Sequence, residues 1–439
     1  MADKRPVEKM STKRLYCMVT EYDNLKFRND VPYIKHGNYW EPVNEHECYK
    51  YIFGVVNEKN VGSVSQYMVK DVLFKLRNSG YNELEFYDDT VYDYVNVNNG
   101  VFDTNTGLLL QKLNTQNFSY CLDFNYRTDV EEDSVKVFNK FISDTFPEDT
   151  EEKKKLLLET IGYAISDLLE AKALIIYLGK TNSGKSQILE LVSSIIRPKC
   201  IVTTVPLECL GNKFNLASLF NSKLNVLTEL NVDSFKCLDI LKQLSASEFV
   251  MAEEKGKPPF SFRLRTKSLN ASNVMPRITE VEGMQAILNR LVILRFPKSV
   301  APENMDIHLL DKLKQEKDYI FSLALDELVR LKKNNFRFTE PQDSVELKAM
   351  YTIKANIIEE FIKDNCNFKK GARIHFSKLY ERFNKYCVDN CLGDIKLTQS
   401  QFTLKILEME GLTRKRFRVN GSRAYWGVEG LELLDDDKE

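Results

Sequence analysis

The stretch best equipped for chemistry is residues 179–186, which read GKTNSGKS. Two glycines let the backbone curl so that its N–H groups point inward, as a loop that holds phosphate oxygens requires. Lys185 would reach the β- and γ-phosphates of a nucleotide, and the hydroxyl of Ser186 would bind Mg²⁺. The pattern predicts a phosphate-binding loop, and a glycine-containing turn that binds nothing is the alternative. The predicted contacts are Gly179, Lys180, Thr181, Asn182, Ser183, Gly184, Lys185 and Ser186.

The residues on either side of this loop predict the elements that must position it. Residues 173–178 form a short continuous apolar run, which is typical of a buried parallel strand. Residues 187–196 carry apolar side chains at helical spacing. A strand, a glycine-rich loop and a helix in this order predict a nucleotide site, because the helix directs its positive dipole end at the phosphates.

Four more apolar runs predict strands at 200–205, 223–230, 266–271 and 291–296, and polar residues stand at their ends. Glu229 could complete a Mg²⁺ shell or orient an attacking water, and Asn273 could contact the γ-phosphate. The alternatives are a surface glutamate after a core strand and a turn asparagine close to a proline. Arg290 directly precedes the last of these strands.

Basic residues gather at two further places. Residues 250–262 predict a hairpin with Lys255 and Lys257 at its tip, where lysines are usually solvated and contact phosphates only if the hairpin lines a channel. The last ninety or so residues predict three helices, at 354–364, 376–388 and 399–409, and a hairpin at 413–428. This pattern favours a winged-helix DNA-binding domain, with a protein-binding winged helix as the alternative. The second hairpin interleaves aromatic residues with Arg414, Lys415, Arg416, Arg418 and Arg423.

Composition limits the classes of protein that fit. The chain has 439 residues and a formal net charge of −1, so any nucleic-acid surface must be local. No apolar run is long enough to span a bilayer and the charged N-terminus lacks a signal-peptide core, so we expect a cytoplasmic protein without a membrane partner. Nine cysteines without a CxxC pair and four scattered histidines do not indicate a metal cluster.

These patterns together predict an α/β fold with several domains. In the amino-terminal region we expect two strands within 33–43, a helix at 64–76, a hairpin at 91–107 that turns at 98–100, and a strand at 120–126. The expected division is a mixed α+β region at 1–130, a helical collar at 131–170, a nucleotide-binding core at 171–333, a polar linker at 334–343, a winged helix at 344–430 and an acidic tail at 431–439.

Taken in order, the segments from about residue 90 onward resemble the superfamily 3 helicases of phages, plasmids, satellite elements and large DNA viruses, in particular the poxvirus-type primase-helicase ATPases. NNGVFDTNTG and IGYAISD are similar to the segments that precede the family's Walker A loop. FNLASLFNSKLNVLTEL resembles its Walker B region. The later resemblances are LDILKQLSASEFVMAEEKGKPPFSF to the motif specific to this superfamily, KSLNASNVMPRI to motif C and ILNRLVILRFP to the arginine-finger segment.

The resemblance implies a P-loop, AAA+-like ATPase that uses ATP and Mg²⁺ and assembles as a ring, expected to be a homohexamer. It makes Asn273 the sensor asparagine and Arg290 the finger that a neighbouring subunit adds to the site of Lys185, Ser186 and Glu229. The family translocates 3′ to 5′ on single-stranded DNA and unwinds duplex DNA during replication, and a separate primase or polymerase is a candidate partner. Thr228 precedes Glu229 where relatives often have a second acid, and no primase domain is expected ahead of residue 90.

Two other functions stay open from the residues alone. One is a sequence-specific origin-binding initiator or regulator that uses ATP only to assemble and does not displace a strand. The other is a P-loop enzyme of small-molecule metabolism, such as a kinase. The basic hairpins argue against the second of these.

Overall fold

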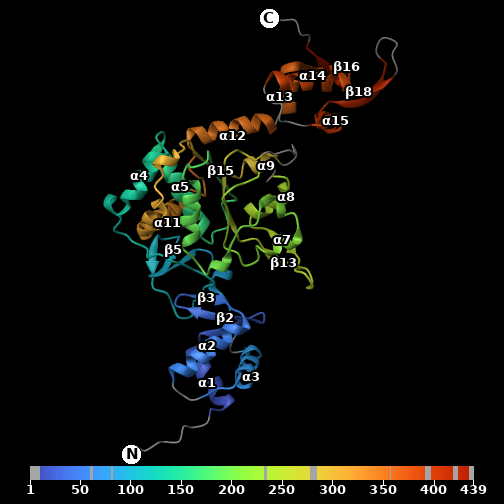
Figure 1. Ribbon diagram of the computed structural model, residues 1–439. Helices are drawn as coiled ribbons and strands as arrows, with labels where there is room; N and C mark the ends of the chain where they lie inside the picture. The colour runs from blue at the N-terminus through green and yellow to red at the C-terminus, as the bar shows by residue number, and fades with distance from the viewer. Residues whose placement is uncertain are drawn as a thin grey trace, which may run out of the picture. The chain divides into compact units, whose positions relative to one another are not determined.

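The chain folds into two compact units that interrupt each other in sequence. The computed structural model describes residues 10–59, 63–80, 83–231, 235–276, 284–355, 357–390, 397–418 and 424–434. The first unit comprises Met1–Leu230, Gln243–Met275 and Val292–Pro341. The second comprises Asn231–Lys242, Pro276–Leu291 and Gln342–Glu439. Figure 1 shows the helices and strands of both.

The amino-terminal part of the first unit packs three helices with a small antiparallel sheet of order β1-β2-β3. Asn44 caps α2 with a capping box: the Asn44 side chain accepts from the Glu47 N–H, and the Glu47 carboxylate accepts from the Asn44 N–H. The strands predicted around Gly37 and the helix predicted near 64–76 are confirmed. The elements are α1 (Thr12–Tyr22), β1 (Leu25–Arg28), β2 (Val31–His36), β3 (Tyr39–Pro42), α2 (Glu45–Glu58) and α3 (Gln66–Arg77).

A second sheet follows, with the order β6-β5-β4-β7-β9. Val97 pairs with Gly100, so Asn98 and Asn99 form the two-residue loop of the hairpin that the sequence predicts. The strand predicted at 120–126 is much shorter, because only Cys121–Leu122 pairs with its neighbours. The strands are β4 (Tyr94–Val97), β5 (Gly100–Asp103), β6 (Leu108–Leu110), β7 (Cys121–Leu122) and β9 (Ile196–Arg197).

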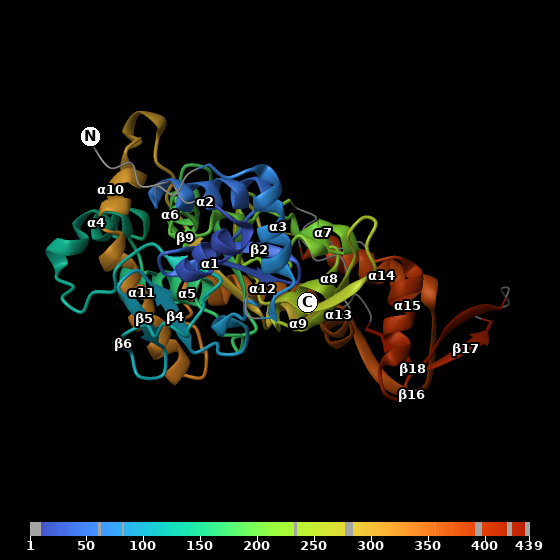
Figure 2. The same ribbon diagram turned by 90° about the horizontal axis from the view of Figure 1, so that it is seen from below.

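A helical layer completes the core of this unit. Helices α5 (Thr150–Ile165) and α11 (Lys317–Lys333) pack against each other, as both views show (Figures 1 and 2). Every side chain of α5 from Leu156 onward is buried, so this helix is covered on all sides. The other helices here are α4 (Lys136–Thr145) and α10 (Leu309–Gln315), with 3-10 turns at Tyr87–Asp89, Glu132–Val135, Lys199–Ile201, Leu207–Cys209 and Pro302–Asn304.

The third sheet is the one that the predicted loop requires. Its order is β10-β11-β14-β8-β15, and β10, β11, β14 and β8 run parallel. Beside it lies the hairpin of β12 (Phe249–Ala252) and β13 (Phe260–Arg263), whose strands pair antiparallel as predicted. The remaining elements are β8 (Leu174–Gly179), α6 (Lys185–Ser194), β10 (Val202–Thr203), α7 (Lys213–Ala217), β11 (Leu224–Leu227), β14 (Lys267–Ser272) and β15 (Leu291–Phe296).

The second unit packs helices against the antiparallel sheet β16-β18-β17. The predicted helices and the basic hairpin are present, but the third strand, β16, was not predicted. Phe361, Phe383 and Phe402 meet at the centre of the core with ring centroids 4.7–6.1 Å apart. The elements are α9 (Met284–Leu288), α12 (Gln342–Ala355), α13 (Ile357–Asn365), β16 (Cys366–His375), α14 (Phe376–Asp389), α15 (Gln399–Glu408), β17 (Thr413–Phe417) and β18 (Tyr425–Leu433), while α8 (Leu238–Ser245) spans the division between the units.

The predicted linker at 334–343 is packed rather than free over most of its length. The Thr339 backbone N–H and hydroxyl donate to the two carboxylate oxygens of Glu159 at 2.7 and 2.9 Å. Phe336 and Phe338 pack edge-on against Tyr163. The middle of the hairpin predicted at 413–428, residues 419–423, lies outside the described residues. The acidic tail predicted at 431–439 overlaps the end of β18, and its residues 435–439 lie outside the described residues. No helix in the described part of the chain combines the length and apolar character needed to cross a membrane.

Gly162 tests the packing of α5 on α11, since a Cβ there would stand 2.2 Å from the carbonyl oxygen of Ala324. We expect Gly162→Ala to push the helices apart and lower the free energy of unfolding by roughly 1–3 kcal/mol. Gly54 is exposed in α2, and a Cβ added there would meet no atom within 4 Å. Gly54→Ala should therefore raise the free energy of unfolding by about 0.5–1 kcal/mol. Urea unfolding followed by circular dichroism measures both, and shifts of the same sign would contradict this packing.

Candidate functional site

The predicted phosphate loop connects β8 to α6 with a conformation that needs glycine. Gly184 stands directly before α6 with φ 91°, in the left-handed region. A Cβ at this position would also lie 2.6 Å from the ring of Phe141. Gly179 ends β8 and passes so close to β15 that a Cβ would stand 2.3 Å from the carbonyl oxygen of Phe296. Neighbouring atoms therefore leave no room for a side chain at either glycine of the motif.

Lys185 turns its side chain back into this loop. Its Nζ donates to the carbonyl oxygens of Gly179 and Lys180 at 2.6 and 2.8 Å, and to the Ser183 hydroxyl at 3.1 Å. The residue is only 5% exposed, and burial lowers the pKa of the ammonium group while the charge of Glu229 acts in the opposite direction. The ammonium group is thus held by neutral oxygens in a partly desolvated position, which suits a group that meets an anion.

Lys185, Asn273 and Glu229 are joined by two successive hydrogen bonds, and we call these three residues the row. The Lys185 Nζ donates to the Asn273 Oδ1 at 3.3 Å, and the Asn273 Nδ2 donates to the Glu229 Oε1 at 3.4 Å. Glu229 follows the carboxyl end of β11, Asn273 follows β14 and the loop follows β8, and these three strands are adjacent and parallel. Ligands of open α/β sheets bind outside the carboxyl ends of such strands.

The rest of the loop is open to solvent. Lys180, Thr181, Asn182 and Ser186 are exposed, whereas Ser183 is buried. The loop is tied to the segment after β15, because the Ser299 hydroxyl donates to the Thr181 carbonyl at 2.6 Å and the Val300 N–H donates to the Asn182 carbonyl at 2.9 Å. Helix α6 has ten residues and begins at Lys185, so the positive end of its dipole lies at the loop.

These side chains fit a phosphate group and a divalent cation. The cradle carries a buried ammonium, backbone N–H groups and a helix N-terminus, which are the donors that phosphate oxygens need. The exposed hydroxyl of Ser186 and the exposed carboxylate of Glu229 are hard oxygen donors of the kind that Mg²⁺ prefers. In the described part of the chain no three His, Cys, Asp or Glu side chains gather as a metal site. A Mg²⁺ ion here would therefore also need oxygens from a bound phosphate group.

The opposite ends of the same strands carry buried charges that sequence reasoning missed. Lys223, directly before β11, donates to Asp167 at 2.8 Å and lies 3.4 Å from the centre of the Tyr120 ring. Lys267, the first residue of β14, donates to the Tyr163 hydroxyl and to the Leu168 carbonyl. The only signal in the sequence is a lysine placed at the start of an apolar run. These contacts fix the starts of the two strands that lead to Glu229 and Asn273.

Arg290 is not among the side chains that the first unit brings together, because it belongs to the second unit. Its Nη1 donates to the Ala286 carbonyl of α9 at 2.6 Å. Its Nε is buried and has no hydrogen-bond partner among the described residues. A buried guanidinium N–H without a partner is costly to the fold.

The lysine hairpin has the predicted form. Gly256 has φ 77°, which allows the chain to reverse between β12 and β13. Lys255 and Lys257 are both exposed at the tip, and Lys257 forms an ion pair with Glu254 at 2.5 Å. Lys255 therefore presents its charge to solvent more freely than Lys257 does.

Four of the five predicted basic residues of the carboxyl-terminal hairpin are described, and Arg423 lies outside the described residues. Arg414, Lys415, Arg416 and Arg418 are exposed on or directly after β17. Lys415 forms an ion pair with Glu429, which also accepts from Arg373 at 2.6 Å. The hairpin is thus basic at its surface, with one carboxylate that offsets part of the charge.

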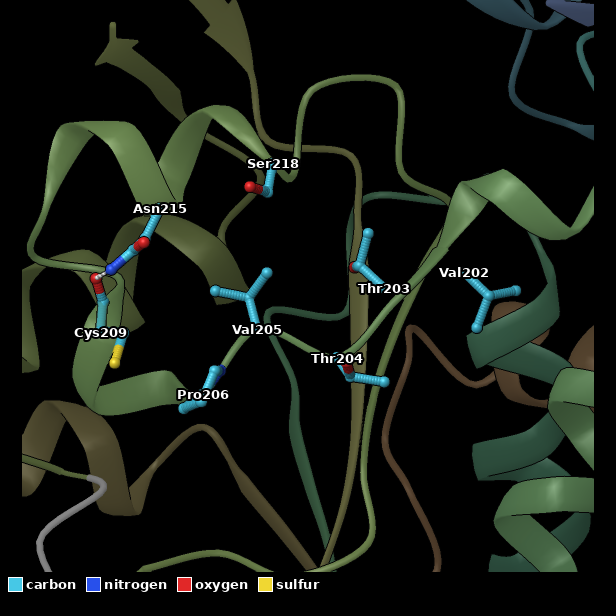
Figure 3. Close-up of a pocket in the computed structure, with 8 residues that line it drawn as sticks. All are labelled: Val202, Thr203, Thr204, Val205, Pro206, Cys209, Asn215 and Ser218. Atoms are coloured by element: carbon cyan, nitrogen blue, oxygen red, sulfur yellow. Dashed lines mark hydrogen bonds between the residues drawn. The ribbon is translucent and has the colours of Figure 1, made fainter. Parts of the chain in front are cut away.

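A separate hollow of about 440 Å³ lies beside the edge strand β10 (Figure 3). On one side of it Asn215 points toward Cys209 and donates to the Cys209 carbonyl at 3.2 Å (Figure 3). The hollow presents hydroxyl, amide and apolar groups but no charged side chain, so it does not suit a phosphate as the loop does. Its lining is Val202, Thr203, Thr204, Val205, Pro206, Cys209, Asn215 and Ser218.

Comparison with known proteins supports the fold and little more. A model described as "Family of unknown function (DUF5906)" matches residues 177–286, and no curated protein matches the chain. The apo structure of the NrS-1 C terminal region (305-718) is similar with a TM-score of 0.51 at 13% identity, covering 96% of this chain and 100% of that chain. The A form apo structure of the NrS-1 C terminal region-CTR has a TM-score of 0.49 at 11% identity, covering 95% and 99%. The likeness with a TM-score of 0.51 supports the α/β fold that the structure shows.

Lys267 makes the anchoring of β14 measurable, since burial lowers its pKa from 10.5 to about 7. Between these values the unfolded chain holds a proton on Lys267 that the folded chain lacks, so folding becomes more favourable as pH rises. Relative to Lys267→Met, the wild-type protein should therefore gain up to about 1.4 kcal/mol per pH unit from about pH 7 to about pH 9.

Urea unfolding at several pH values measures this difference. The exposed Lys50 in α2 provides the control, because Lys50→Met should leave the pH dependence of the wild-type protein unchanged. Parallel curves for the wild-type protein and Lys267→Met would show that the lysine stays charged in the folded state.

Proposed function

We propose that this protein is an ATP-dependent DNA helicase of the superfamily 3 type, active in the cytoplasm during replication of a phage, plasmid or satellite element. One observation carries the proposal. Lys185, Asn273 and Glu229 form a hydrogen-bonded row at the carboxyl ends of three adjacent parallel strands, beside a glycine loop that opens a helix. This is the arrangement expected of a P-loop, AAA+-like core.

Each residue of the row has a role that its position supports. Bound ATP and Mg²⁺ would supply the phosphoryl group and the cation that offsets its charge. Lys185 and the loop N–H groups would hold the phosphate charge. Ser186 would bind the cation, while the exposed Glu229 carboxylate would orient or deprotonate the attacking water. Asn273 is hydrogen-bonded to both Lys185 and Glu229 and would hold their side chains in position relative to each other.

Assembly as a homohexameric ring is part of the proposal. The sites of Ser186, Glu229 and Asn273 are exposed in the first unit, so a second copy could add a cation there. A positive group placed from outside stabilises the charge of the phosphoryl-transfer transition state. The resemblance assigns this role to Arg290, whose Nη1 donates to the Ala286 carbonyl of α9.

DNA binding would use the two basic surfaces. Lys255 and Lys257 at the hairpin tip suit contacts to the phosphates of a single strand, which a motor can make without reading sequence. The helices and the basic β17–β18 hairpin of the second unit suit a winged-helix domain that binds duplex DNA through Arg414, Lys415, Arg416, Arg418 and Arg423. Translocation 3′ to 5′ and cooperation with a primase or polymerase are carried over from the resemblance alone.

An origin-binding initiator that uses ATP only to assemble is the second candidate. The exposed arginines of the second unit favour it, because they are available for binding without any motor action. The two candidates differ in a single activity, since only the helicase displaces a strand.

Loss of the loop lysine tests the nucleotide site. Lys185→Ala should abolish ATP hydrolysis, because the variant loses the buried ammonium that meets the phosphates. Lys172→Ala removes an exposed lysine just before β8 and should hydrolyse ATP at the wild-type rate. Phosphate release with and without single-stranded DNA measures both. Hydrolysis by Lys185→Ala at the wild-type rate would refute the assignment of the site.

Lys255 separates the helicase from the initiator. Lys255→Ala should hydrolyse ATP as the wild-type protein does but lose unwinding of a forked duplex by roughly tenfold or more, because a phosphate contact of the hairpin is gone. Lys70→Ala, an exposed lysine in α3, is the matched control. Absence of strand displacement by the wild-type protein itself would favour the initiator, and normal unwinding by Lys255→Ala would remove the hairpin from the mechanism.

A further inference from the structure

The β17–β18 ribbon of the second unit carries two aromatic side chains that do not pack in the hydrophobic core. In both views the ribbon extends beyond helices α13, α14 and α15 (Figures 1 and 2). Tyr425 and Trp426 are neighbours in β18 and therefore point to opposite faces, yet they are 54% and 49% exposed. Further along the same strand, Val428 and Leu431 are fully buried and supply the core. The aromatic pair thus stands outside the core.

Trp426 shares its face of the ribbon with two arginines. Arg416 is its direct cross-strand partner, and Arg414 is one pair further along on the same face. The guanidinium carbon of Arg414 lies 4.5 Å from the centre of the Trp426 ring, as in a cation–π contact. We call Arg414, Arg416 and Trp426 the Trp426 face.

The Trp426 face has a positive charge that no carboxylate offsets. Arg416 donates to the Ala424 carbonyl at 3.3 Å, and Arg414 contacts the indole ring. Within the described residues, neither forms an ion pair with a carboxylate. The opposite face differs, since Lys415 and Arg373 both pair with Glu429 there. An anion approaching the ribbon is therefore favoured on the Trp426 face.

We propose that the Trp426 face is a binding site for single-stranded nucleic acid, with an unpaired base stacked on Trp426 and phosphates held by Arg414 and Arg416. A flat, half-exposed indole beside uncompensated arginines matches the two parts of a nucleotide, its base and its phosphate. Bases of a duplex are stacked on each other and offer no free face to an aromatic side chain, so the face selects unpaired strands.

This inference deepens the proposed function of the second unit, because it rests on DNA binding there but assigns an unpaired strand where a winged helix alone would suggest duplex DNA. It needs neither ATP hydrolysis nor a ring. If the Trp426 face instead binds another protein, adding nucleic acid would not change the Trp426 fluorescence, and Trp426→Ala would not change the affinity for nucleic acid.

Trp426 reports its own contacts, since the chain has two tryptophans and Trp40 is only 1% exposed. The experiment titrates the full chain carrying Lys255→Ala and Lys257→Ala, without nucleotide, with oligodeoxythymidylate. These two changes remove the hairpin contacts of the proposed motor. We expect saturable quenching of the exposed tryptophan signal, and a dissociation constant from fluorescence anisotropy of labelled oligonucleotide that rises on the order of tenfold in Trp426→Ala.

Three variants make the result specific. Trp426→Phe keeps an aromatic face and should retain most of the affinity, which also excludes a folding defect as the cause of the loss. Arg414→Lys keeps the charge without the planar guanidinium and should fall between the two. Tyr67→Ala removes an aromatic side chain that is 78% exposed in α3 and should bind as the parent does.

Equal affinity of Trp426→Ala and the parent would overturn the proposal, as would stronger binding and quenching by a duplex of the same length, or no quenching by either nucleic acid. The helicase proposal fails separately. If Lys185→Ala hydrolyses ATP normally while the quenching is present, the ATPase assignment is wrong and the Trp426 face stands.

Discussion

The candidate site depends on where the chain places one buried ammonium group. Lys185 is almost fully buried and is held by carbonyl oxygens, a hydroxyl and an amide rather than by an ion-paired carboxylate. Desolvating a cation is costly unless its hydrogen bonds are replaced, so the loop must keep the curled shape that brings Gly179 and Lys180 to the Nζ. The glycines at both ends of the loop make that shape possible. The same ammonium group also holds Asn273, and through it Glu229, at the mouth of the sheet.

The parallel sheet transmits this constraint along its strands. Glu229 follows the carboxyl end of β11 and Asn273 follows that of β14. Buried lysines lie at the other ends, with Lys223 directly before β11 and Lys267 as the first residue of β14. Asp167 after α5 pairs with Lys223, so the helical layer fixes the start of the strand whose end carries the carboxylate. Both strands are buried on both faces, so a one-residue slip would exchange the side chains of the two faces and would also pull a lysine from its partner. Charges far from the site therefore contribute to its geometry.

Local pattern was sufficient for the elements around the site. The glycine loop, the apolar runs of β8, β11 and β14 and the hairpin turn at Asn98 are encoded by neighbours in sequence. What the sequence could not supply depends on partners far along the chain. The pair of Asp167 with Lys223 and the docking of Thr339 on Glu159 join residues that no periodicity relates. Strand β16 was missed because Lys369, Lys370 and Gly371 interrupt its alternation, and the pairing with β18 shifts register there.

The exposure of the row bears on how such a site could work. Lys185 is buried, whereas Ser186, Asn273 and Glu229 are open to water, which weakens the field that their charges create. Electrostatic stabilisation of a transition state is strongest where water is excluded and donors are fixed in advance. A phosphoryl-transfer site with one buried and one open side therefore gains most from a cover that brings a cation of its own. This asymmetry is the physical reason to look for a second copy of the chain that covers the open side of the site.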